Sequence, residues 1–509
     1  MTHFVRNLGM LCLAGTTLVG CADQGLEADS TAPALESTAT AQTAQMARLR
    51  FVHGAPTVAA VDVYIGASTA PLWTAVAFGT ATPYAALVPD GLQLVLRTAG
   101  AAATAAPIYT SDVIVAQAGD QITSIAGGIL GSTIATTAFR VQPYTEAFGP
   151  QPRGEALVRF VQDSHGLSAA GFDVDADGMI DVPAVAAFTA SDAAGLAIER
   201  DRDGVQLAID TGTPTKQLTT FTVSREVLHQ RGGIFLALVG VPTFVPSDAR
   251  GLELLAVGPT TATLIRQNPT VYVMPTIPDS TGIDAFAIGR DFNVIPVAQN
   301  LGFGVLAPAL QVAPSERGYH VIVTRAATGT DPLAGFPLAF ESTGPLVAGE
   351  RYLAVLSGFA NASVADGARR SRVRMTIVRD GFDRTVAATG RLRAIAASPD
   401  APSVDVGQFP PGTGTAFTGI AGLDALTYRN ASAEVGTVLS AAPLNPAIRA
   451  TGATDAVKFR FGALLATDRD FGIVAGAFAP VTGDVASRFI VVKTPGSGAW
   501  TAQTLSPLP

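Results

Sequence analysis

The sequence contains four copies of one pattern, and this internal repetition constrains the fold more than any other feature. The segment ARLRFVHGAPTVAAVDVYIG, which begins at Ala47, recurs without a gap as GRLRAIAASPDAPSVDVGQF from Gly390 onward. Two weaker copies, ALVRFVQDSHGLSAAGFDVDADG and TVYVMPTIPDSTGIDAFAIG, lie between them. We therefore expect four similar units, in which one aspartate recurs as Asp62, Asp173, Asp284 and Asp405.

A second landmark keeps the same register. The segment Asp90–Leu94 (DGLQL) recurs as Asp203–Leu207 (DGVQL) and, more distantly, as Arg317–Val321 (RGYHV). Each copy then ends in an apolar, Gly-rich segment, as in FLALVGV and FGIVAGAF, followed by an alternating one, as in RVRMTIV and RFIVVKT. A chance match of one segment would not bring the next into register, so we interpret the pattern as a structural repeat.

Alternating hydrophobicity within each copy predicts strands. Val61, Val63 and Ile65 alternate with Asp62 and Tyr64, which is the period of a half-buried strand. Turns rich in Gly, Pro, Asp and Thr separate such segments at spacings typical of two-sheet sandwiches, and convincing amphipathic helices are missing. The sequence therefore predicts an all-β chain of four tandem β-sandwich domains with an immunoglobulin-like architecture.

The first residues are typical of an export signal. Arg6 precedes the apolar run Leu8–Gly20, whose thirteen residues are too few for a helix that spans a bilayer, which needs about 20. The run ends in Leu-Val-Gly-Cys and resembles the lipobox of bacterial lipoproteins, which implies cleavage before Cys21 and acylation of its thiol. By the same resemblance, Ala22 stands where an Asp would retain a lipoprotein at the inner membrane, which implies the outer membrane as the destination.

The segment after Cys21 is rich in Ala, Thr, Ser, Gln and Glu and has little to bury, so we expect a flexible tether. The predicted organisation is a signal peptide over 1–20, the lipidated Cys21 with its tether over 21–45, and sandwich repeats over 46–150, 151–266, 267–385 and 386–509. Cys12, the one other cysteine, leaves with the signal peptide. The mature chain is therefore expected to have no disulfide, cysteine nucleophile or cysteine metal site.

Composition agrees with a folded chain that does not bind nucleic acid. Apolar residues make up 48% and charged residues 15% of the sequence, and the formal net charge is −8. No basic stripe is present, which argues against nucleic acid as a partner. The longest later apolar run, 232–245, is interrupted by Pro242 and is better interpreted as a buried strand with its turn.

The opening strands of two copies carry a family resemblance. Two stretches resemble the start of the bacterial domain of unknown function 4397: HGAP from His53 together with VDVY from Val61, and SPDAPSVDV from Ser398. Copies one and four resemble it directly, whereas copies two and three are included through the internal register. The resemblance implies an exported, β-rich module of cell-envelope proteins, and it implies no reaction.

The recurring polar residues are interpreted as structural. Arg50 recurs as Arg159 and Arg393, while Tyr272 stands in its place in the third copy. We hypothesise that these arginines pair with the recurring aspartates on neighbouring strands, at roughly 1 kcal/mol per pair if exposed. His53 is absent from the other three copies, so we expect it to close its strand by bonding a backbone carbonyl rather than to do chemistry.

The second copy contains a weak calcium candidate. Asp173, Asp175 and Asp177 precede Gly178 with the spacing of the start of a calcium loop, whose alternating oxygens converge on a hard cation. The twelfth position of that loop is Ala184 rather than the expected Glu, and Asp173 is already the strand residue of the repeat. Calcium is therefore the one cofactor that the sequence raises.

Enzyme motifs such as Gly-x-Ser-x-Gly, a phosphate-binding loop with Lys or His-Glu-x-x-His do not occur. We therefore expect no catalytic residues and favour a noncatalytic, lipid-anchored envelope protein that serves adhesion, envelope organisation or the binding of an envelope protein or glycan. The alternative is a ligand-binding or hydrolytic lipoprotein in which one diverged copy, most plausibly the second, has acquired a site.

Overall fold

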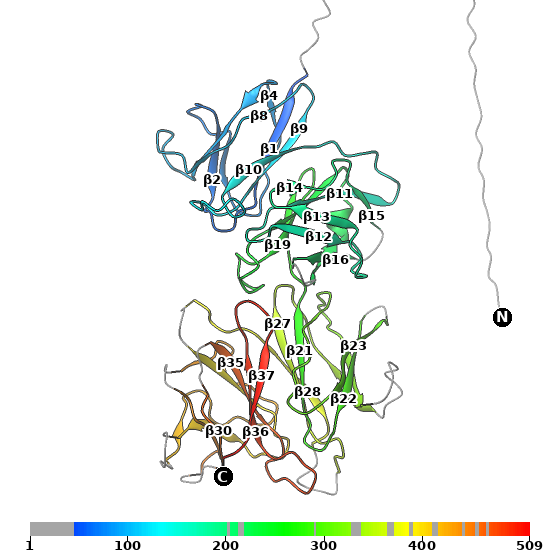
Figure 1. Cartoon of the computed structure of the whole chain (residues 1–509), viewed down its shortest axis with the longest axis vertical. Helices are drawn as coiled ribbons and strands as arrows, with labels where there is room; N and C mark the ends of the chain where they lie inside the picture. The colour runs from blue at the N-terminus through cyan, green and yellow to red at the C-terminus, as the bar shows by residue number, and fades with distance from the viewer. Residues whose placement is uncertain are drawn as a thin grey trace, which may run out of the picture. The chain divides into compact units, whose positions relative to one another are not determined.

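The computed structural model is all-β and contains several separate sheets (Figure 1), which confirms the predicted fold class. It describes residues 45–200, 204–211, 218–289, 292–326, 337–363, 371–385, 390–409, 416–439, 443–453, 458–464 and 468–508. Cys21 and the tether up to residue 44 lie outside this part of the chain. Within the described residues the single α-helix is α1 (Arg225–Leu228), and no helix there is long and apolar enough to cross a membrane.

The first repeat forms two four-stranded sheets, which we call sandwich 1. Its first sheet has the order β10 (Arg140–Thr145), β9 (Gln121–Gly127), β1 (Ala47–His53), β4 (Ala85–Leu87). Its second sheet has the order β3 (Trp73–Val76), β2 (Val61–Ile65), β6 (Leu94–Thr98), β7 (Tyr109–Thr110). A small ribbon pairs β5 (Gly91–Leu92) with β8 (Ile114–Val115).

Sandwich 2 repeats this order. Its first sheet runs β20 (Ala262–Arg266), β19 (Glu253–Val257), β18 (Ile234–Val239), β11 (Glu155–Gln162), with β14 (Thr189–Ala190) and β15 (Leu196–Glu199) both pairing β11. Its second sheet runs β13 (Val182–Ala186), β12 (Ala169–Asp173), β16 (Gly204–Asp210), β17 (Leu218–Ser224). The added β20 lies at the edge of the first sheet.

Sandwiches 3 and 4 keep the order again. In sandwich 3 the first sheet has the order β28 (Arg374–Arg379), β27 (Arg351–Ser357), β21 (Thr270–Thr276), β24 (Leu310–Gln311). Its second sheet has the order β23 (Val294–Leu301), β22 (Ile283–Ile288), β25 (His320–Arg325), β26 (Pro337–Ser342). In sandwich 4 the first sheet has the order β37 (Thr501–Leu505), β36 (Arg488–Lys493), β35 (Arg469–Ala475), β29 (Arg391–Ala396), β32 (Thr437–Val438). Its second sheet has the order β31 (Thr418–Gly419), β30 (Val404–Gln408), β33 (Pro446–Ala450), β34 (Phe459–Arg460).

Each sandwich shows one parallel pairing between strands that are distant in sequence. The opening strand lies parallel to the Gly-rich apolar strand near the end of the same repeat, as β1 with β9, β11 with β18, β21 with β27, and β29 with β35. Parallel neighbours need a long connection, and here the intervening chain supplies it by forming the second sheet. The opening segment and the Gly-rich apolar segment of each repeat are therefore neighbouring inner strands of its first sheet.

Each sandwich has its own apolar core, and two further clusters join the sandwiches in pairs. One of these clusters packs the first sheet of sandwich 1 against that of sandwich 2, through residues such as Val52, Ile125, Phe235 and Leu255. The other packs the first sheets of sandwiches 3 and 4 together, through residues such as Met274, Val355, Phe471 and Ile490. No such cluster among the described residues mixes sandwiches 2 and 3.

The prediction of half-buried strands is wrong for the opening strands β1 and β2, in which six of seven and four of five residues are buried. The buried strand expected within 232–245 is confirmed, since every residue of β18 is buried, as is every residue of β35. One face of each strand lies in the sandwich core and the other at the contact with the neighbouring sandwich. Arg50 of β1 and Asp62 of β2, which alternate with apolar residues, are themselves only 1% and 5% exposed. Strands buried on both faces read as continuous apolar runs, which explains FLALVGV and FGIVAGAF.

Candidate functional site

The recurring aspartate stabilises an irregular turn of backbone beside its strand. The Asp62 carboxylate accepts hydrogen bonds from the backbone N–H of Ala75 (2.7 Å) and of Gly100 (2.8 Å). Ala75 has a φ of +51°, and the register of β2 with β3 shifts between Val61 and Val63. A residue with a side chain at positive φ costs roughly 1–3 kcal/mol, so it needs such a partner. Asp62 therefore serves the scaffold.

The third and fourth copies repeat this arrangement. Asp284 accepts the backbone N–H of Asn300 (2.6 Å, φ +46°), and Asp405 accepts that of Ala425 (2.9 Å, φ +52°). Burial disfavours the charged form of Asp405, but the bonds from Ala425, from the Thr451 hydroxyl and from Arg449 outweigh it and lower the pKa of this carboxyl below its usual value. The aspartate of these copies has the same structural role.

The hypothesis that the recurring arginines pair with the recurring aspartates is wrong. Arg50 lies on the first sheet of sandwich 1 and Asp62 on the second, and packed sheets stand about 10 Å apart. Arg50 points out of sandwich 1, where it contacts the part-buried Glu146 at 3.2 Å and donates to the carbonyl of Gly258 in sandwich 2. Each recurring arginine instead bonds the backbone of the sandwich packed against its own.

The other copies show the same crossing contact. Arg159 of sandwich 2 donates to the carbonyl of Thr145 in sandwich 1 at 2.9 Å. Arg393 of sandwich 4 donates to the carbonyl of Arg379 in sandwich 3 at 2.6 Å. Both acceptors are the last residues of equivalent strands, β10 and β28. The arginine thus marks the contact between paired sandwiches.

Tyr272, which replaces the arginine in the third copy, keeps this role by other means. Its ring stacks on Trp500 of sandwich 4, with centroids 4.3 Å apart and planes 5° from parallel. The backbone N–H of Trp500 donates to the Tyr272 hydroxyl at 3.4 Å. An aromatic stack therefore substitutes for a charged hydrogen bond at the same position of the pair.

His53 lies as expected at the end of its strand. Its Nε2 is 3.2 Å from the carbonyl oxygen of Ala59, within the turn that follows β1. Burial lowers the pKa of His53, and the bond to Ala59 offsets only part of this effect. A buried histidine bonded to backbone closes a strand, as the sequence predicted.

The acidic loop of sandwich 2 does bring its three carboxylates together. One oxygen of each of Asp173, Asp175 and Asp177 lies within 4.8 Å of the others, with Asp173 buried and the other two exposed. Backbone groups already bond these oxygens: Gly178 N–H donates to Asp173 at 2.8 Å, and Met179 N–H to Asp177 at 2.7 Å. The arrangement can offer oxygen ligands to a cation.

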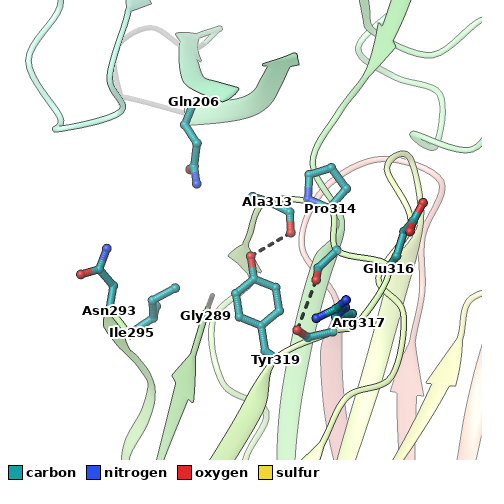
Figure 2. A pocket seen from close by; sticks show the side chains of 11 residues that line it. Gln206, Gly289, Asn293, Ile295, Ala313, Pro314, Glu316, Arg317 and Tyr319 are labelled. Carbon is teal, nitrogen blue, oxygen red and sulfur yellow. Dashed lines mark hydrogen bonds between the residues drawn. The ribbon is translucent and has the colours of Figure 1, made fainter. Parts of the chain in front are cut away.

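A cavity opens where sandwich 3 faces Gln206 of sandwich 2 (Figure 2). Its volume is about 420 Å³, and two side-chain amides, Gln206 and Asn293, line it. Tyr319 also lines it, and its hydroxyl donates to the carbonyl of Ala313 at 2.8 Å. The remaining lining residues are Gly289, Ile295, Pro314, Ser315, Glu316, Arg317 and Gly318. Among the described residues that line it, the cavity offers several hydrogen-bonding groups to a small polar ligand and one carboxylate, that of Glu316.

Sequence reasoning missed an unusual carboxylate at the contact of sandwiches 1 and 2. Asp163 follows β11, is fully buried, and neither carboxylate oxygen accepts a hydrogen bond from any described residue. Burial raises the pKa of Asp163 to about 8. Comparison of the repeats could have signalled it, because a charged residue stands here where the other copies carry Gly54, Thr276 and Ala397.

Comparison with known proteins agrees with part of the sequence interpretation. Residues 47–175 match the model of the domain of unknown function DUF4397, a segment that covers sandwich 1 and strands β11 and β12. The crystal structure of a "putative cell adhesion protein" from Bacteroides uniformis shares 11% identity and covers 44% of this chain and 98% of its own, with a TM-score of 0.18. At that score the likeness carries no argument about fold or function. No curated protein sequence matches the chain.

Proposed function

We propose that the chain is a noncatalytic lipoprotein of the cell envelope that presents tandem β-sandwiches for adhesion, envelope organisation or the binding of protein or glycan. The observation that supports this proposal best is how the recurring polar residues are used. The aspartates bond irregular backbone turns, and the arginines bond neighbouring sandwiches. The repeated part of the sequence thus specifies a scaffold, which leaves partner recognition to exposed loops and outer sheets.

The proposed anchor is Cys21, with the outer membrane as its destination. We expect the full chain, produced in a bacterial host fed a labelled fatty acid, to incorporate the label. Cys21→Ser should abolish incorporation, whereas Cys12→Ser should leave it unchanged, because Cys12 lies in the expected signal peptide. Label retained in Cys21→Ser, or absent from the unaltered chain, would contradict the anchor.

The noncatalytic role is tested with the purified chain and with intact cells. We expect cells that display the chain to adhere to immobilised envelope proteins or glycans, and protease treatment of intact cells to remove both the chain and the adhesion. The purified chain should not turn over ester, glycoside or peptide substrates. Turnover of any of these, with adhesion unaffected by loss of the chain, would refute the proposal.

A second proposal is that sandwich 2 binds calcium, and the gathering of Asp173, Asp175 and Asp177 favours it. Calcium should then raise the unfolding temperature of the chain, while the double variant Asp175→Asn, Asp177→Asn should not respond. Asp192→Asn, which changes another exposed carboxylate of sandwich 2, is the matched control. An equal calcium response in the double variant would exclude this loop as the site.

A further inference from the structure

We propose that the contact between sandwiches 1 and 2 is a pH-responsive switch controlled by Asp163, which loosens the pair when this side chain ionises. The contact is an apolar interface between two first sheets, formed by residues of β1, β9, β10, β11, β18 and β19. Asp163 places a carboxyl group into that interface from the end of β11. The following observations support the proposal.

The first observation is the close approach of Asp163 to sandwich 1. A Cβ atom added to Gly127, the last residue of β9, would lie 2.4 Å from the carboxyl carbon of Asp163. The carboxyl group therefore packs directly on the Gly127 backbone, across the contact. The backbone N–H of Asp163 donates to the carbonyl of Leu238 at 2.9 Å, which holds the residue against β18 on its own side.

The second observation is that the pairing of sandwiches does not require a carboxylate here. Asp163 stands four residues after Arg159, and the residues at the same distance from Arg50, Tyr272 and Arg393 are Gly54, Thr276 and Ala397. Thr276, the polar one of these, has its hydroxyl bonded to the carbonyl of Leu356 at 3.1 Å. Only the second copy carries an ionisable group at this position.

The third observation concerns the groups around Asp163. Tyr144 of β10 interacts with it electrostatically, is itself buried, and its hydroxyl has no hydrogen-bond partner among the described residues. Arg159 lies over the Tyr144 ring, 5.6 Å from its centroid, and bonds the carbonyls of Ser191 and Thr145. His165, two residues beyond Asp163, is buried, neither of its ring nitrogens bonds another described residue, and burial lowers its pKa to about 4. When Asp163 ionises, no described residue therefore supplies a bonded counterion for its charge.

The direction of the pH effect follows from proton linkage. An exposed aspartate has a pKa near 3.8, whereas the closed contact raises the pKa of Asp163 to about 8, because burial disfavours the charged form. The closed pair holds the proton more tightly than the open pair. The contact is therefore strongest below pH 4, and its opening constant increases by up to about tenfold per pH unit as the pH rises toward 8.

The test measures opening through a buried thiol. Ala237 is fully buried in the contact of sandwiches 1 and 2, so Ala237→Cys, in a chain that carries Cys12→Ser and Cys21→Ser, reacts with a maleimide only when the pair opens. Rates are divided by those of Val88→Cys, an exposed position of sandwich 1, to remove the thiol's own pH dependence. Between pH 5 and 8 the normalised rate should rise by up to about tenfold per unit.

Two comparisons decide the outcome. In Asp163→Asn and in Asp163→Ala the pH dependence at position 237 should be lost. The reaction rate of Ala475→Cys, a buried probe in the contact between sandwiches 3 and 4, should be the same with and without Asp163→Asn. Burial also raises the pKa of Asp470 to about 7 and that of Glu253 to about 6, but these two groups titrate in every variant and so do not affect the comparison. An equal pH slope with and without the Asp163 carboxyl would overturn the proposal.

A second measurement needs no cysteine. Binding of the apolar dye ANS to the otherwise unaltered chain should increase between pH 5 and 8, because opening exposes the apolar cluster between the sheets. The increase should be absent from Asp163→Asn. If both chains bind the dye equally across this range, Asp163 does not control the contact, whatever effect Ala237→Cys has on folding.

Discussion

Replacing Asp405 with Ala should destabilise sandwich 4 strongly. The carboxylate is buried and accepts hydrogen bonds from Ala425 N–H at 2.9 Å, the Thr451 hydroxyl at 2.8 Å and Arg449 Nε at 3.1 Å. Ala425 has a φ of +52°, so its backbone depends on this partner. Removing the carboxylate leaves all three donors without this acceptor.

The expected loss is about 2 to 4 kcal/mol at neutral pH. A hydrogen bond contributes about 1 kcal/mol to stability, and one that involves a charged group about 1.5 to 3 kcal/mol, while relaxation of the turn recovers part of the sum. An exposed ion pair alone would be worth less than about 1 kcal/mol. The magnitude thus distinguishes a carboxylate that holds a turn from a surface charge.

Urea unfolding followed by Trp500 fluorescence measures this loss. The chain has two tryptophans, so a Trp73→Phe background leaves Trp500, which lies in the contact of sandwiches 3 and 4, as the reporter of that pair. Asp424→Ala is the matched control, because this carboxylate is exposed and directly precedes Ala425. The control should change the unfolding free energy by less than about 0.5 kcal/mol.

The pH dependence gives a second check. Because the folded chain lowers the pKa of Asp405, its contribution is present above the ordinary pKa of 3.8 and is lost as the pH falls through the folded value. The difference between the unaltered chain and Asp405→Ala should therefore shrink below pH 4. A loss under 0.5 kcal/mol at pH 7, or a difference that is the same at pH 3, would refute the structural role.

Three further substitutions test the paired architecture. Arg50→Ala should lower the unfolding free energy of sandwiches 1 and 2 by about 2 to 4 kcal/mol in calorimetry, because it leaves the largely covered carboxylate of Glu146 without its cation, whereas Arg48→Ala, at an exposed position near the start of β1, should cost under about 0.5 kcal/mol. Trp500→Ala should cost sandwiches 3 and 4 about 3 to 5 kcal/mol in thermal unfolding, and a smaller loss than 1 kcal/mol would contradict the stack. Gly127→Ala should lower the unfolding free energy by about 1 to 3 kcal/mol, because its new Cβ meets the Asp163 carboxyl, and this loss should disappear in a chain that also carries Asp163→Gly. If the losses of the two single variants simply add in the double variant, the two residues do not touch.

The repeat allowed the strands, the fold class and the structural use of several residues to be predicted. Strand periodicity and turn residues are local properties, and a landmark that recurs in register identifies equivalent strands without any knowledge of their partners. The role of His53 was predictable for the same reason, because its acceptor, Ala59, lies six residues away. Likewise, Asp173, Asp175 and Asp177 gather in the structure because one short loop holds all three.

The contacts between residues distant in sequence could not be predicted, because a hydrophobic pattern shows that a side chain is covered but not which residues cover it. Arg50 and Asp62 alternate with apolar residues in the same way, yet one bonds a neighbouring sandwich and the other a turn of its own. The continuous apolar sequences of β18 and β35 indicate burial on both faces, but only the packing of whole sheets decides that the second face contacts another sandwich. Asp163 shows the same limit, since its charge was visible in the sequence and its enclosure between two sheets arose only when the sandwiches paired.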